Sequence, residues 1–169
     1  MLIKSTNLEG VKIIEPPTIF HDHRGDYIET YNKGLYYNND IKIDFIQDDI
    51  SISQKNVLRG IHGDSKTWKL ISCIYGEIFV IIVNNDPKSK QYNQYEHFII
   101  SDKNNYQILV PPLFGNGHLV LSDKCIFHYK QSTYYNRNNQ FTILWNDPKY
   151  NFKWPIKNPI LSKRDLGHD

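Results

Sequence analysis

The segment Val57–Asp64 carries the residues of the chain that are best suited to proton chemistry. It ends a hydrophobic run with an arginine, Arg59, and a histidine, His62, and glycines stand at positions 60 and 63. A histidine held at the end of a strand suits general acid–base chemistry because its pKa lies near neutrality. Regular alternation places Arg59 and Ile61 on one face and His62 on the other, unless the glycines introduce a bulge. By residue type alone, a structural histidine in a β core is the more common interpretation.

Further polar residues on other predicted strands, in one turn and in the tail could complete a site around this histidine: Lys69, Asn116, His118, Tyr129 and Asp165. One reaction, proton removal at a carbon next to a carbonyl, uses most of this set. His62 is then the base, and Asp165 holds its imidazole in one tautomer. Lys69 or Arg59 stabilises the enolate oxygen. Tyr129 returns a proton from the opposite side and inverts the carbon.

Each member of this set also has an ordinary structural interpretation. Lys69 could be solvated at a strand edge, and Asp165 could cap the last turn. Tyr129 is one of twelve tyrosines, many of which suit an amphipathic sheet. The residues alone therefore leave both the catalytic and the structural interpretation open. The choice between them depends on the strands and turns that position these residues.

The elements expected from the pattern are short strands at even spacing. β-branched and aromatic runs, alternation and turn residues predict strands at 11–15, 27–31, 43–53, 57–62, 70–75, 78–83, 95–101, 107–110, 118–121, 126–133 and 141–145. Residues 115–117 are expected to turn, residues 32–42 to hold one short helix, and the tail to be irregular. This pattern predicts an all-β sandwich or barrel. A jelly-roll barrel is favoured because charged groups recur on strand faces that could line a cavity, and no Cys…Trp…Cys framework is present.

Bulk properties exclude several classes of protein. A length of 169 residues indicates one domain, 1–169, and the net charge of +2 with no basic stripe argues against nucleic acid as a partner. Cys73 and Cys125 lie apart inside apolar runs, which predicts reduced, buried thiols in a cytoplasmic protein. The sequence shows no signal peptide and no apolar run of membrane-spanning length, so no membrane partner is expected.

An ordered series of motifs resembles the nucleotide-sugar epimerase family of dTDP-4-dehydrorhamnose 3,5-epimerase. The matching segments span nearly the whole chain, at 22–25, 47–49, 57–62, 68–70, 111–114, 119–122, 127–130, 143–148, 154–155 and 159–165. The resemblance implies a cupin-type jelly-roll barrel with few short helices. It also implies a homodimer with exchanged N-terminal strands, and neither a metal nor a redox cofactor.

The resemblance assigns roles to individual residues. It makes His62 the base, Asp165 its partner and Tyr129 the acid on the other face. Lys69 falls where the family places a lysine near the sugar carbonyl, and Arg59 where an arginine meets the substrate. The positions that line the nucleotide and diphosphate end of the site correspond to Arg24, Glu29 and Gln47.

The chain departs from the family pattern at two places. A family histidine is replaced by Asn116, which cannot shuttle protons, and a histidine follows at His118; both are candidates for substrate binding. Gly63-Asp64 replaces the usual Tyr-Gln after the base. These features resemble a branch that acts on GDP-linked 4-keto-heptoses or 6-deoxyhexoses of bacterial capsules. The expected substrate is a nucleoside-diphosphate 4-keto-6-deoxyhexose or 4-keto-heptose, with GDP favoured and dTDP an alternative, inverted at C3, C5 or both.

Three alternatives remain. A metal cupin oxygenase needs two or three histidines and a carboxylate around one ion, and the segment around His62 has no His-x-His. A nucleotide-sugar 3,4-ketoisomerase tends to carry a second histidine soon after the first, where this chain has Gly63-Asp64-Ser65. A sugar-binding cupin without activity is disfavoured because Tyr129 and Asp165 are present. No catalytic or metal-binding role is expected for His21, His23, His97, His128 and His168.

Overall fold

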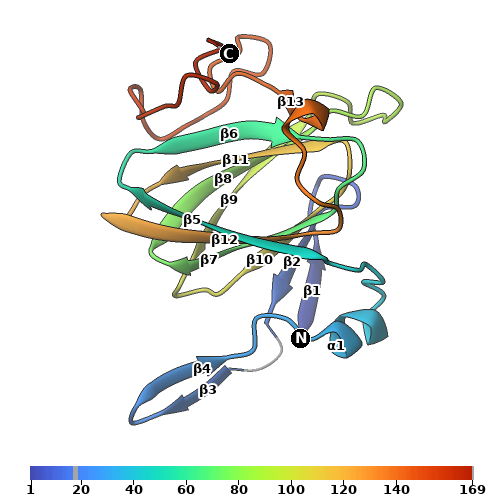
Figure 1. Ribbon diagram of the computed structural model, residues 1–169, viewed down its shortest axis with the longest axis vertical. Helices are drawn as coiled ribbons and strands as arrows, with labels where there is room; N and C mark the ends of the chain where they lie inside the picture. Colours follow the sequence, from blue (N-terminus) through green and yellow to red (C-terminus); the bar gives the residue numbers. More distant parts are fainter. Residues whose placement is uncertain (17–18, 169) are drawn as a thin grey trace.

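Two antiparallel β-sheets face each other and form a jelly-roll barrel (Figure 1). The computed structural model describes residues 1–16 and 19–168. The six-stranded sheet has the order β1 (Leu2–Ser5), β2 (Lys12–Glu15), β10 (Gln107–Val110), β7 (Lys69–Tyr75), β12 (Lys124–Gln131) and β5 (Gln47–Gln54). The five-stranded sheet has the order β13 (Phe141–Thr142), β6 (Leu58–Gly63), β11 (Phe114–Val120), β8 (Glu77–Asn84) and β9 (Tyr95–Ser101). The predicted all-β jelly roll is confirmed.

Helices are few and short, as expected. The helix α1 (Lys33–Asn38) lies within the predicted range 32–42, and the side chain of Asn32 caps it by accepting a hydrogen bond of 3.2 Å from the amide of Leu35. A 3-10 turn, η1, covers Arg137–Asn139. None of the helices in the described part of the chain is long and apolar enough to cross a membrane.

A separate hairpin of β3 (Ile19–Asp22) and β4 (Gly25–Ile28) extends away from the two sheets (Figure 1). Its tip is a polar turn, and its second strand begins earlier and ends earlier than the predicted 27–31. Both aromatic side chains on this hairpin, Phe20 and Tyr27, are exposed. The hairpin therefore adds nothing to the apolar core of the barrel.

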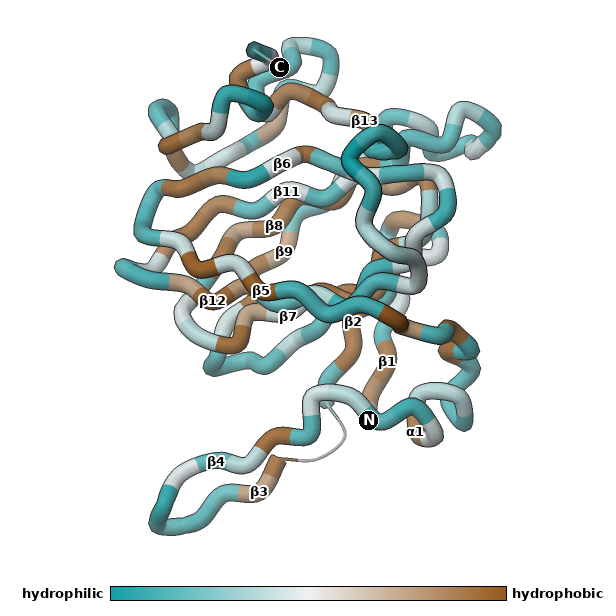
Figure 2. The backbone as a smooth tube through the Cα atoms, viewed as in Figure 1, coloured by the Kyte–Doolittle hydropathy of each residue, from teal (hydrophilic) through white to brown (hydrophobic). Residues whose placement is uncertain are grey.

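Three apolar layers hold the barrel together, and Figure 2 shows apolar residues concentrated in its strands. The first layer lies between the two sheets and includes Ile71, Val80, Ile108 and Phe127. The second covers the outer face of the five-stranded sheet, where the C-terminal segment packs on β6 and β8. The third lies under α1 on the outer face of the six-stranded sheet. The two cysteines are free and buried in the first layer, as predicted.

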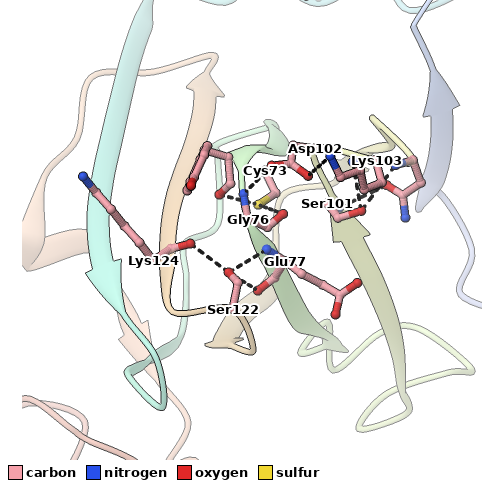
Figure 3. Close-up of polar contacts among 10 residues, drawn as sticks. Cys73, Gly76, Glu77, Ser101, Asp102, Lys103, Ser122 and Lys124 are labelled. Carbon is pink, nitrogen blue, oxygen red and sulfur yellow. Dashed lines mark hydrogen bonds and ion pairs between the residues drawn. The ribbon is translucent and has the colours of Figure 1, made fainter.

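The turn between β7 and β8 is fixed by polar contacts with two other loops (Figure 3). The amide of Gly76 donates to Oδ2 of Asp102 at 2.8 Å, and the amide of Glu77 donates to Oγ of Ser122 at 2.9 Å. The hydroxyl of Ser122 donates in turn to the carbonyl of Lys124 at 2.8 Å. This network ties β9 and β12 to the end of β7 that lies opposite Lys69.

The expected turn at 115–117 is wrong, because β11 begins at Phe114 and runs straight through it. Gly115 and Gly117 lie in this strand, and because they have no side chains β6 can approach closely. A Cβ atom on Gly115 would lie 2.7 Å from Cγ2 of Ile61, and one on Gly117 would lie 2.8 Å from its Cγ1. These glycines therefore serve packing rather than chain reversal.

The other differences concern strands at the edges of the two sheets. β1 was not expected, since four residues, two apolar followed by two polar, give little pattern. The predicted strand 43–53 begins only at Gln47, and the predicted strand 141–145 is limited to Phe141–Thr142. Edge positions carry weak signals because only one side of each strand is paired.

We expect Gly115→Ala to destabilise the fold. Its methyl group would overlap Ile61, and overpacking of a core costs about 1–3 kcal/mol. Urea unfolding followed by far-ultraviolet circular dichroism measures the effect. Gly34→Ala is the matched control, because its Cβ would meet nothing closer than 3.6 Å within a helix. Equal stability of the two variants would contradict the packing role of Gly115.

Candidate functional site

A cavity of about 290 Å³ opens between the two sheets. Both sheets and the C-terminal segment line it. It brings together seven of the residues singled out in the sequence: Arg59, His62, Lys69, Asn116, His118, Tyr129 and Asp165. These residues come from β6, β7, β11, β12 and the C-terminal segment, and no local sequence motif connects these elements.

A β-bulge in β6, where this strand pairs with β11, sets the directions of the β6 side chains. Asn116 is paired with His62 and His118 with Arg59, so two residues of β6 face the single Gly117 of β11. Gly60 makes this possible with φ of 109°, and a Cβ there would lie 2.7 Å from the carbonyl oxygen of Asn116.

The bulge corrects the expectation of regular alternation along β6. Leu58 and Ile61 both pack in the outer apolar layer, although they are three residues apart. Arg59 and His62 both line the cavity. An arginine and a histidine that alternation would separate therefore face the same space.

His62 and Asp165 form a close pair at the cavity wall. Nε2 of His62 lies 2.8 Å from Oδ1 of Asp165, as an ion-pair contact rather than a well-aligned hydrogen bond. The hydroxyl of Ser162 donates to Oδ2 at 2.7 Å, and the amide of Gly60 donates to Oδ1 at 3.3 Å. Burial raises the pKa of Asp165, but the contacts with His62 and Ser162 outweigh it and hold this pKa below its usual range. The carboxylate stays ionised, and Nδ1 is the ring nitrogen left to accept a proton.

Lys69 is a buried cation that lines the same cavity as His62. It begins β7 and is only 7% exposed, and its Nζ donates to Oδ1 of Asn116 at 3.1 Å. Burial lowers the pKa of Lys69 to about 8, against the opposing effect of Asp64. At neutral pH the ammonium is charged, and its charge acts strongly in a site that excludes much of the solvent.

Tyr129 faces the cavity from the other sheet. It stands on β12, whereas His62 stands on β6, so the two side chains approach the cavity from opposite walls. Burial raises the pKa of Tyr129 to about 12, with a further contribution from Asp49. The phenol is therefore protonated at neutral pH and available as a proton donor.

His118 and Asn116 both line the cavity. His118 is 3% exposed, and its ring stacks on Phe127 with centroids 4.1 Å apart. Burial, followed by the positive charge of Arg59, lowers the pKa of His118 to about 3, so its imidazole is neutral. Arg59 itself is exposed, and its Nε donates to Oγ of Ser53 at 3.0 Å.

Three predicted residues do not line this cavity. Arg24 stands at the tip of the β3–β4 hairpin, where its guanidinium binds the carboxylate of Asp22 at 2.6 Å, and Glu29 follows β4. Gln47 lies at the start of β5, where its Oε1 accepts a hydrogen bond of 2.8 Å from the amide of Tyr135. Tyr135 lines the cavity, so Gln47 is adjacent to it, whereas the hairpin residues are remote from it within the protomer.

The cavity also holds residues that were not singled out: Ser51, Phe127, Gln131, Tyr135, Gln140, Ser162 and Arg164. Alternation along β5 and β12 was the available signal for the first three, because they share a face with Asp49 or Tyr129. Tyr135 and Gln140 come from a loop that carries no periodic pattern. Among the described residues, no three His, Cys, Asp or Glu side chains come close enough to hold a metal ion.

The barrel and its cavity define a cupin-type enzyme equipped to move protons at carbon. The comparisons with known proteins narrow this class. A sequence model of the family described as dTDP-4-dehydrorhamnose 3,5-epimerase matches residues 5–169. The chain belongs to this family, and it is an epimerase, an enzyme of the isomerase class.

Several relatives match over nearly their whole length. The dTDP-4-dehydrorhamnose 3,5-epimerase of Shigella flexneri is 34% identical over 99% of this chain and 94% of its own. A Bacillus anthracis epimerase solved with TDP and PPi bound has a TM-score of 0.92 and 33% identity, covering 97% of this chain and 95% of its own. A Legionella pneumophila epimerase in complex with dTDP-4-keto-L-rhamnose has a TM-score of 0.92 and 35% identity, covering 98% of this chain and 90% of its own.

Proposed function

We propose that this protein inverts one or two carbons next to the ketone of a nucleoside-diphosphate 4-keto sugar. One observation carries the proposal: a His62–Asp165 pair on one wall of the cavity faces Tyr129 on the other, with the Lys69 ammonium beside them. Inversion requires a base and an acid on opposite faces of one carbon, and this arrangement supplies both.

The reaction proceeds in two proton transfers. Nδ1 of His62 takes the proton from the carbon next to the ketone, and the C–H electron pair moves into an enolate. The ammonium of Lys69 stabilises the enolate oxygen. Tyr129 then gives its phenolic proton to the opposite face of the same carbon, so the configuration inverts. Solvent returns a proton to Tyr129 and removes one from His62, which Asp165 stabilises as the imidazolium.

The relatives favour a dTDP-linked 4-keto-6-deoxyhexose as the substrate. The Legionella pneumophila structure contains dTDP-4-keto-L-rhamnose, and the Bacillus anthracis structure contains TDP. We therefore propose this sugar nucleotide first, inverted at C3 and C5, in the synthesis of a bacterial surface polysaccharide in the cytoplasm. We propose that residues 1–169 act as one domain and without a metal or redox cofactor.

A GDP-linked 4-keto-heptose or 6-deoxyhexose is the second candidate, and it rests on the two places where the chain departs from the family pattern. The side chain at this position is an amide that accepts from Lys69 and exchanges no proton. Asp64, the second departure from the family pattern, accepts hydrogen bonds from the amides of Lys66 and Thr67 and from the side chain of Gln140, which lines the cavity, and its charge acts on Lys69. An amide in place of the family histidine favours inversion at a single carbon.

Incubation with dTDP- and GDP-linked 4-keto sugars in deuterated water tests the function. Deuterium at C3, at C5 or at both identifies the carbons attacked, and the nucleotide that supports faster exchange identifies the preferred carrier. The enzyme is purified without a histidine tag and assayed before and after chelation. No exchange with any of these sugars would overturn the epimerase, and stoichiometric iron, manganese or zinc would overturn its metal independence.

We also propose a homodimer in which N-terminal strands are exchanged. The β3–β4 hairpin extends from the barrel with Phe20 64% exposed and Tyr27 68% exposed, and it carries Arg24 at its tip. A second copy would cover these rings and receive Arg24 and Glu29 at the nucleotide end of its cavity. Light scattering is expected to give twice the 20.0 kDa of one chain. A monomer at assay concentration would contradict the exchange.

We expect the rate to fall as the pH rises through about 8. Burial depresses the pKa of Lys69 to about 8, and only the protonated amine stabilises the enolate oxygen. The value of kcat/KM should therefore decrease about tenfold per pH unit above this pKa. The pH profile of deuterium exchange from pH 6 to 10 measures it. A profile without a decline below pH 10 would show that the charge of Lys69 is not required.

A further inference from the structure

Three side-chain atoms in the described part of the chain are buried without a hydrogen-bond partner, and all belong to residues of the cavity: Ser51 Oγ, His62 Nε2 and His118 Nε2. The first of the two histidines has its aspartate at ion-pair distance. Ser51 and His118 have no such partner. Buried polar groups in folded proteins are normally paired, so each unpaired one calls for an explanation.

Both unpaired groups neighbour the ring of Phe127. His118 stacks on Phe127 with an interplanar angle of 19°, and Ser51 is paired with Phe127 across β5 and β12. Arg59 is paired with His118 across β6 and β11, and its Nε is already bound to Ser53. Ser51 and His118 therefore form one end of the cavity, which we call the Phe127 end. Lys69 and Asn116 bind each other elsewhere in the same cavity.

The chemistry of this end suits a neutral group that both donates and accepts. A neutral imidazole offers one donor and one acceptor, and a serine hydroxyl offers a donor and two acceptor sites. A methyl group placed there would leave both side chains unpaired, and a phosphate would gain no charge from either. A sugar hydroxyl satisfies both.

We propose that His118 and Ser51 bind one hydroxyl group of the sugar, which makes His118 a specificity-determining residue. This inference rests on the proposed function, since it assumes that a sugar nucleotide occupies the cavity. Phe127 holds the imidazole in place by stacking. The subsite selects sugars that carry a hydroxyl at the position that reaches the Phe127 end, and it disfavours the corresponding deoxy sugars.

Binding of unreactive ligands tests the subsite independently of catalysis. The probes are nucleoside-diphosphate glucose and its 2-, 3-, 4- and 6-deoxy analogues, each with dTDP and with GDP, titrated calorimetrically. These ligands lack the ketone and are not turned over. For the wild-type chain, removal of one particular hydroxyl is expected to weaken binding about tenfold, which corresponds to one ordinary hydrogen bond.

His118→Phe is the decisive variant, because it keeps an aromatic ring on Phe127 and removes the nitrogens. In this variant, removal of the critical hydroxyl should weaken binding less than about twofold. The affinities of the other deoxy analogues, relative to the full sugar nucleotide, should stay as they are in the wild type. Ser51→Ala should reduce the same penalty, and it serves if the first variant does not fold. His128→Phe is the control: this histidine stands on β12, outside the cavity lining, and binds Ser72, so it should leave the penalty unchanged.

The outcomes distinguish a failure of the hydroxyl subsite from a failure of the proposed function. A wild-type chain that binds these ligands without preferring any hydroxyl overturns the subsite and leaves the epimerase standing. Variants that weaken all ligands equally also overturn it, because they show a structural role only. A wild-type chain that binds none of the ligands and exchanges no deuterium overturns the proposed function, and the subsite with it.

Discussion

His62→Asn is expected to abolish deuterium exchange at every carbon of the substrate. The base would lose its proton-accepting nitrogen, while an amide of similar shape would remain beside Asp165. General base catalysis contributes about 10²–10⁴ to a rate. Nuclear magnetic resonance of the sugar in deuterated water measures the loss, with protein concentration matched to the wild type.

His128→Asn is a suitable control for this change. His128 also lies on a strand and contacts an acidic side chain, Asp48, but it is absent from the cavity lining. Its replacement should leave exchange at the wild-type rate. If His62→Asn exchanges as fast as the wild type, another group removes the proton and the assignment of the base is wrong.

Tyr129→Phe has the second largest expected effect, and it separates two steps. His62 can still remove the proton and return deuterium to the same face, so exchange continues. Inversion requires a donor on the opposite face, and the phenol of Tyr129 supplies it. We expect inversion to fall by about 10²-fold or more, the lower range for a general acid, while exchange persists.

Comparing the exchanged fraction with the inverted fraction in one reaction gives the ratio directly. Tyr75→Phe is the matched control, since Tyr75 is exposed at the far end of β7 and lines no part of the cavity. Inversion at the wild-type rate in Tyr129→Phe would assign the proton donor to another residue.

Much of the barrel was predictable because its strands carry local signals. The ranges expected for β9 and β10 agree with the structure, and both are bounded by asparagine or proline turns. Alternation along β12 also placed Phe127, Tyr129 and Gln131 on one face, and the cavity contains all three. Periodicity succeeds where a strand is regular and one of its faces differs from the other.

The parts that were not predictable depend on contacts between distant segments. The bulge that turns Arg59 and His62 to one side exists because β6 meets Gly117 of β11, more than fifty positions away. The turn expected at Gly115 became a strand because Ile61 fills the space that a side chain would occupy. Local sequence shows a glycine but not the neighbour that requires it.

The C-terminal segment that supplies Asp165 also covers the outer face of the five-stranded sheet. Ile160 exchanges backbone hydrogen bonds with the start of β6, donating to the carbonyl of Asn56 at 2.8 Å and accepting from the amide of Leu58 at 2.9 Å. Because chains are made from the N-terminus, His62 leaves the ribosome about a hundred residues before its carboxylate partner. A nascent chain therefore has a barrel sequence but no oriented base. We therefore expect His62 to be oriented only when the segment that carries Asp165 has been released and has docked.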